Sequence, residues 1–130
     1  MSESQAITKV SRIQAVLQAG SAVFGLSALI IIGFPAFFNQ LLGLPSSASL
    51  DWAMRMIGIT LVALAGNMFS VASRGSDASV LFSGKVMLVS AAGLGVLTLL
   101  IPAPLGWFTY LYAAVGFGFS AAYAWALTKK

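Results

Sequence analysis

Four long apolar runs, separated by short polar or Pro/Gly-rich segments, dominate the pattern of this chain. The runs cover about residues 13–34, 52–73, 80–101 and 107–127. A helix of roughly 20 residues is about 30 Å long, which matches the hydrocarbon core of a bilayer. The pattern therefore predicts an all-α fold, a four-helix transmembrane bundle that forms a single integral membrane domain over residues 1–130.

The segment before the first apolar run is short and polar. Residues 1–11 predict a mobile or interfacial tail, and Lys9 and Arg12 flank the apolar run that follows. A secretory signal peptide would share this basic flank. Its apolar region would be shorter, and a small-residue cleavage site would follow it. The pattern favours a retained transmembrane helix.

A short helix is predicted between the first two spans, over about residues 35–43. Pro35 stands where a helix can begin, and Gly43 stands where one can end. The segment is too short to cross a bilayer, so it is expected to lie in the outer interface. Its aromatic side chains would face the lipid, while Asn39 and Gln40 would face water.

Composition excludes most kinds of chemistry. The chain is 59% hydrophobic and 8% charged, against about 25% charged residues in soluble domains. It has no cysteine and no histidine, which removes thiolate sites and the commonest general base and metal ligand. Its three acids are Glu3, Asp51 and Asp77, and the last two are predicted on opposite sides of the membrane. We therefore expect no enzymatic activity, no cofactor and no metal.

Basic residues predict how the chain lies in the membrane. Six of them would share one side in the predicted topology, and only Arg55 would lie on the other. Because basic residues concentrate on the cytoplasmic side, both termini are expected there, in a cytoplasmic-type membrane. The net charge of +4 comes from these loops and does not indicate a nucleic-acid partner. The six residues are Lys9, Arg12, Arg74, Lys85, Lys129 and Lys130.

Four polar residues are predicted at a similar depth below the cytoplasmic surface. Gln18, Asn67, Lys85 and Tyr123 each lie roughly 7–9 Å in, at 1.5 Å per residue. Gln18 and Asn67 are the strongest candidates for a buried polar layer. They could hydrogen-bond each other across helices, or they could form a site for a solute or a lipid headgroup.

Asp51 and Arg55 form a second candidate group, at the outer end of the second span. Asp51 fits a helix N-cap, and Arg55 follows one turn later on the same face. An ion pair with snorkelling of Arg55 would make them an interface anchor. The alternative is contact with an anion, a lipid phosphate or a partner protein, since charge inside a span is costly.

Small residues recur every four positions on the last span. Close backbone approach drives helix association in lipid, so this packing seam predicts a helix contact. The contact could be inside the bundle, or it could join two copies or a partner. The seam consists of Ala114, Gly118, Ala122 and Ala126.

One resemblance to a known family covers about residues 25–70. The segments G-FPAFFNQLLGLP and W-AMRMIG resemble the first half of DoxX-like small four-helix membrane proteins. The resemblance implies a four-helix bundle with both ends in the cytoplasm. It implies no specific activity, and such proteins often accompany larger membrane enzymes. The matching residues are Pro35, Leu41, Leu42, Gly43, Arg55 and Gly58.

Three functions fit these observations. The first is a non-catalytic accessory or assembly subunit that contacts membrane lipids and packs in a homo-oligomer or a larger membrane complex. The second is a small-solute transporter or channel that uses the Gln18 and Asn67 layer. The third is a protein that holds a lipid, quinone or pigment between its helices.

Overall fold

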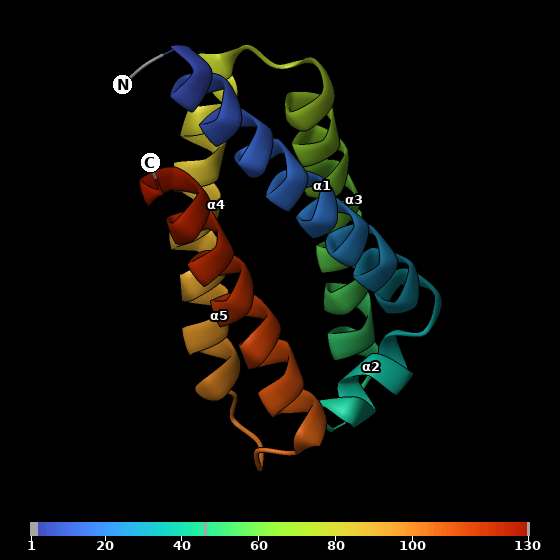
Figure 1. Cartoon of the computed structure of the whole chain (residues 1–130). Helices are drawn as coiled ribbons and strands as arrows, with labels where there is room; N and C mark the ends of the chain where they lie inside the picture. The colour runs from blue at the N-terminus through green and yellow to red at the C-terminus, as the bar shows by residue number, and fades with distance from the viewer. Residues whose placement is uncertain (1–2, 46, 130) are drawn as a thin grey trace.

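Helices are the only regular structure in residues 3–45 and 47–129, the part of the chain that this computed structural model describes. Four of these helices are long and apolar enough to cross a membrane, which confirms the predicted all-helical fold with four membrane-length helices. Helices suit a bilayer because each one satisfies its own backbone polar groups. In chain order (Figure 1) they are α1 (Glu3–Gly33), α2 (Pro35–Leu41), α3 (Ala48–Arg74), α4 (Asp77–Leu99) and α5 (Trp107–Thr128).

Three helices begin earlier than the hydrophobic pattern predicts, including α4, which starts at Asp77 rather than at about residue 80. α1 starts at Glu3, so the predicted polar tail is helical as far as it is described; residues 1 and 2, like Lys130, lie outside the described residues. α3 starts at Ala48, because Ser47 is its N-cap and accepts a hydrogen bond from the Leu50 amide at 3.1 Å. The expected N-cap Asp51 lies instead in the first turn, so the prediction of its capping role was wrong.

The short helix α2 begins at the predicted residue, Pro35, and ends at Leu41, two residues before the predicted end at Gly43. Pro35 lies in its first turn, and Gly43 follows it with a φ of 76°, a left-handed conformation that favours glycine. The predicted orientation of Asn39 was wrong, because this side chain is fully buried rather than turned toward water. Phe38 is buried beside it and meets the rings of Phe108 and Tyr112 edge-on, at 5.4 and 5.5 Å between centroids.

The four long helices associate as two pairs. α1 packs chiefly on α3, and α4 packs chiefly on α5, whereas α3 and α4 touch little although a short turn joins them (Figure 1). Each pair is held by close backbone approach and by a serine hydroxyl. Ser21 donates to the Ala65 carbonyl at 3.0 Å in the first pair, and Ser120 donates to the Leu88 carbonyl at 3.0 Å in the second.

Glycines permit the close approach within each pair. A Cβ on Gly58 of α3 would lie 2.6 Å from the Ile32 side chain of α1. A Cβ on Gly116 of α5 would lie 3.0 Å from the Ala91 carbonyl and 3.1 Å from the Gly95 nitrogen of α4. The second contact is with backbone atoms, which cannot rotate away. Dispersion across such contacts associates helices in lipid.

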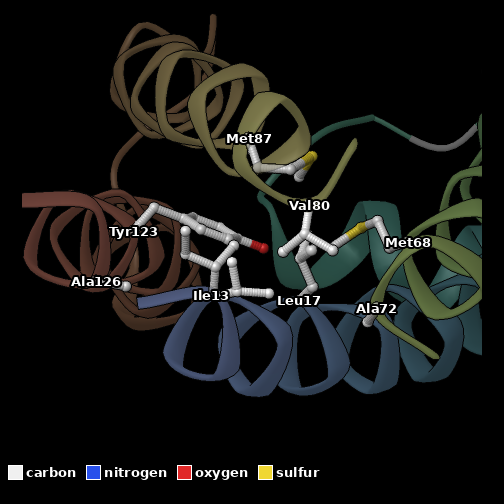
Figure 2. Close-up of a cluster of buried hydrophobic side chains, with 9 residues drawn as sticks. Ile13, Leu17, Met68, Ala72, Val80, Met87, Tyr123 and Ala126 are labelled. Carbon is white, nitrogen blue, oxygen red and sulfur yellow. The ribbon is translucent and has the colours of Figure 1, made fainter. Parts of the chain in front are cut away.

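Both ends of the bundle are closed by clusters of side chains. The described ends of the chain and the turn between α3 and α4 lie at one end, here called the terminal end, and α2 lies at the other, the α2 end (Figure 1). A buried cluster around Tyr123, Ile13 and Leu17 fills the terminal end (Figure 2). A second cluster around Phe38 and Met54 fills the α2 end.

The close approach at Gly116 leads to a stability prediction. Gly116→Val should destabilise the fold by roughly 1–3 kcal/mol, because the new side chain would push α5 off the backbone of α4. The matched control is Gly93→Val on α4, where a Cβ would meet nothing within 4 Å. It should change stability by less than about 0.5 kcal/mol. Unfolding in mixed detergent micelles, titrated with dodecyl sulfate, measures the stability of both variants. Equal losses of stability in the two variants would contradict close packing at Gly116.

Candidate functional site

The predicted polar layer does not assemble inside the bundle. Gln18, Asn67 and Lys85 are all exposed on the outside of their helices, and only Tyr123 is buried. Asn67 Nδ2 donates to the Ala63 carbonyl of its own helix at 2.8 Å, rather than to Gln18. A polar side chain in an apolar helix can satisfy itself locally in this way, so depth alone does not turn it inward.

Asp51 and Arg55 have different partners from the expected ones. Asp51 Oδ1 accepts a hydrogen bond from Asn39 Nδ2 at 3.2 Å, which ties α2 to α3. Arg55 Nε donates to the Ile32 carbonyl at 3.2 Å, in the last turn of α1. A cation at a helix C-terminus interacts favourably with the carbonyls and with the helix dipole. Arg55 therefore caps α1 instead of pairing with Asp51.

Arg12 caps the C-terminus of another helix at the terminal end. Its Nη2 donates to the Lys129 carbonyl at 2.6 Å and to the Ala126 carbonyl at 3.4 Å, so it caps α5 from α1. The guanidinium carbon lies 5.4 Å from the centre of the Trp125 ring, and the Lys129 ammonium lies 5.0 Å from it. These contacts are cation–π interactions. Arg12 thus links the α1–α3 pair to the α4–α5 pair, whereas Arg55 links α3 to α1 within one pair.

The predicted small-residue seam does not lie on one face of the bundle. Ala126 is fully buried and Ala122 is half-buried, whereas Ala114 and Gly118 are exposed. A Cβ on Gly118 would meet nothing within 4 Å. The reason is geometric: with 3.6 residues per turn, a stripe of every fourth residue rotates by about 40° at each step. The stripe therefore passes from the interior to the exterior along α5.

An apolar cavity lies between the two helix pairs. Its volume is about 180 Å³, and all five helices contribute to its wall. Its lining runs from Phe38 at the α2 end to Tyr123 at the terminal end. Val23, Ile57 and Leu94 line it and are still 36–48% exposed, so the cavity is open to the exterior. It arises because residues within each pair approach closely while α3 and α4 touch little.

Among the described residues of the lining, only three side chains carry a nitrogen or oxygen atom, and none carries a charge. Thr98 donates to the Leu94 carbonyl at 2.6 Å, and Tyr112 donates to Ser27 Oγ at 2.8 Å. The Tyr123 hydroxyl is buried and has no hydrogen-bond partner. The cavity lining thus includes one residue with an unsatisfied polar group, at the terminal end.

Sequence reasoning found Tyr123 but grouped it with the wrong residues. The cavity itself was missed, although one signal for it exists. Tyr112 and Tyr123 are separated by three helical turns, which places both rings on one face of α5. Two tyrosines in such register, with polar hydroxyls on an apolar membrane helix, indicate an inward face. The same face carries Gly116, where α4 approaches most closely.

The two asparagines form a natural comparison for stability. Asn39→Leu should destabilise the fold by roughly 1–3 kcal/mol, because it removes the hydrogen bond to Asp51 from a fully buried position. Asn67→Leu should have an effect below about 0.5 kcal/mol, because Asn67 is exposed and bonds its own helix. Thermal unfolding in dodecyl maltoside measures both. A larger loss for Asn67→Leu would show that Asn67 has a partner inside the bundle.

Comparison with known proteins does not assign this chain to a family. No model of a protein family matches the sequence, and no curated protein or solved structure matches the chain. The resemblance to DoxX-like proteins therefore stays a prediction, and the function has to be inferred from the geometry of the chain itself.

Proposed function

We propose that this protein is a non-catalytic membrane protein that binds a lipid-soluble molecule between its two helix pairs. The cavity of about 180 Å³ is the observation that supports this function most directly. Protein interiors contain few voids larger than a water molecule. A space of this size exceeds the small voids of a packed interior, and a wall made almost wholly of carbon is typical of sites for apolar ligands.

The surroundings of the cavity support arrival of the ligand from the bilayer. Ile57 on α3 and Leu94 on α4 line the cavity and are exposed on two helices that touch little. Many large apolar side chains cover the outer surface, and Leu29 and Val89 are 67% and 70% exposed. A molecule dissolved in lipid could therefore pass between α3 and α4 without crossing water.

The same lining argues against catalysis at this site. A general acid or base needs an ionisable group near the reacting atoms, with a pKa close to the working pH. The wall contributes only threonine and tyrosine hydroxyls, together with apolar side chains. Binding, storage or delivery of a hydrophobic molecule is the chemistry that such a wall can support.

The proposal includes a placement in the membrane. Both termini would lie in the cytoplasm, because six basic residues share the terminal end of the predicted topology. α2 would then lie in the outer interface. Trp52 and Trp107, which are 65% and 70% exposed at the α2 end, are suited to the headgroup region.

Filling the cavity should abolish binding. Val115→Phe adds a ring to a residue of the lining and should reduce the occupancy of co-purified lipid-soluble ligand by about tenfold or more. Val89→Phe adds the same ring at a side chain that is 70% exposed, and occupancy should not change. Native mass spectrometry of the two variants, released from mild detergent, measures bound mass. Equal occupancy in both variants would contradict ligand binding in this cavity.

A second function, an accessory or assembly subunit, is favoured by the outward half of the small-residue seam. Ala114 and Gly118 are exposed, and space around Gly118 is open. Small residues on the outer surface of a membrane helix permit close approach of another helix. That helix could belong to a second copy or to a larger complex. This function is compatible with ligand binding, because neither residue lines the cavity.

Self-association through the seam makes a separate prediction. Gly118→Leu should shift the protein from an oligomer toward a monomer in mild detergent, because the side chain would hold a second helix away. Gly93→Leu, at a glycine with equally open surroundings on α4, should leave the oligomer intact. Analytical ultracentrifugation gives the mass of each species. A wild-type chain that is monomeric at all concentrations would contradict self-association.

Transport of a small polar solute has less support. Gln18 and Asn67 are exposed on the outside of the bundle, and neither lines the cavity. A polar solute would therefore find no continuous series of polar side chains between the helices.

A further inference from the structure

The Tyr123 hydroxyl is placed to meet a ligand. The side chain is 1% exposed, and its oxygen has no hydrogen-bond partner. Figure 2 shows this oxygen pointing away from α5 into the cluster that closes the terminal end. The oxygen lies beside Gly20, where a Cβ would be only 3.2 Å from it, and both residues line the cavity. A buried hydroxyl without a partner is costly, so an acceptor that reached it would be favoured.

The other two hydroxyls of the lining already donate hydrogen bonds to protein atoms. Thr98 and Tyr112 donate to Leu94 and Ser27, respectively. Both lie near the α2 end, whereas Tyr123 lies at the terminal end. The two ends of the cavity therefore differ: one has satisfied donors, and the other has a free O–H. A ligand with its acceptor oxygen at one end would bind in a single direction.

The shape and charge of the cavity restrict the rest of the ligand. On α1 the lining reaches from Gly20 to Ile31, and on α5 from Tyr112 to Tyr123. Each of these stretches is about 16 Å long at 1.5 Å per residue. A cavity of this length with a volume of about 180 Å³ is narrow, which suits one extended chain. None of the described residues that line it is charged, so a carboxylate or an ammonium group would be left uncompensated.

We infer that the cavity takes a neutral long-chain carbonyl compound, whose carbonyl oxygen accepts a hydrogen bond from the Tyr123 hydroxyl. This inference rests on the proposed ligand-binding function. The hydrocarbon chain lies along the wall toward Phe38 at the α2 end. Selection follows from two features of the site: an acceptor is needed at Tyr123, and no group compensates a charge.

Three probes with chains of sixteen carbons distinguish the need for an acceptor at Tyr123 from the exclusion of charge. Methyl palmitate carries a neutral carbonyl, hexadecane carries none, and palmitate carries a charge. Each is titrated into the delipidated full-length chain in dodecyl maltoside, and bound mass is measured by native mass spectrometry. The variants are Tyr123→Phe, which removes only the hydroxyl, and Tyr110→Phe, a control on the same helix that is 55% exposed and does not line the cavity.

The wild type and Tyr110→Phe should bind methyl palmitate about two- to tenfold more tightly than hexadecane, which is the worth of one hydrogen bond. Both should bind palmitate most weakly. Tyr123→Phe should lose the preference for the ester while keeping its affinity for hexadecane. The infrared carbonyl band of bound ester should also lie at lower frequency in the wild type than in Tyr123→Phe.

The outcomes distinguish the inference from the function on which it rests. If hexadecane and methyl palmitate bind equally well to the wild type, or if Tyr123→Phe keeps the preference and the band position, the role of Tyr123 is overturned while ligand binding stands. If palmitate binds most tightly, the requirement for a neutral ligand is overturned. If no probe binds the wild type, both the inference and the proposed function fail.

Discussion

Close contact between helix backbones is the interaction on which this structure depends, and it occurs within two pairs of helices. Gly58 permits α3 to approach α1, and Gly116 permits α5 to approach α4. Lipid gives no hydrophobic driving force between helices, so dispersion at such contacts determines which helices associate. Each pair gains by approaching closely, and α3 and α4 gain little from each other. The cavity between the pairs is a direct consequence.

The ends of the bundle keep that cavity from collapsing. Phe38 packs edge-on against Phe108 and Tyr112 at the α2 end, and the cluster around Tyr123 fills the terminal end. Bulky side chains at the ends and glycines within each pair act together, because the ends hold the pairs apart while the glycines hold each pair together. Arg12 and Arg55 add links between helices by capping the C-terminal turns of α5 and α1. These two arginines thus serve the architecture, and none of the described residues in the cavity wall is charged.

Hydropathy and helix-breaking residues were sufficient to predict the four long helices, the short helix that starts at Pro35 and, to within two residues, its end at Leu41. They did not predict which side of each helix faces inward. In a soluble protein the polar side marks the surface, but here both sides of a helix are apolar. Asn67 illustrates the difficulty, since it bonds its own backbone and remains outside, while Asn39, predicted to face water, is fully buried. The partners of Arg55 and Asp51 depend on where α1 and α2 end, which spacing along α3 does not show.

The central claim is that the space between the helix pairs holds an elongated neutral molecule that ends at Tyr123. An experimental structure of the wild-type chain, purified with its native lipids retained, tests it most directly. The claim predicts a continuous rod of density along the wall from Phe38, with its terminal atom within hydrogen-bond distance of the Tyr123 hydroxyl. Direct packing of the pairs against each other, with side chains filling the space and a protein group bonded to Tyr123, would contradict it.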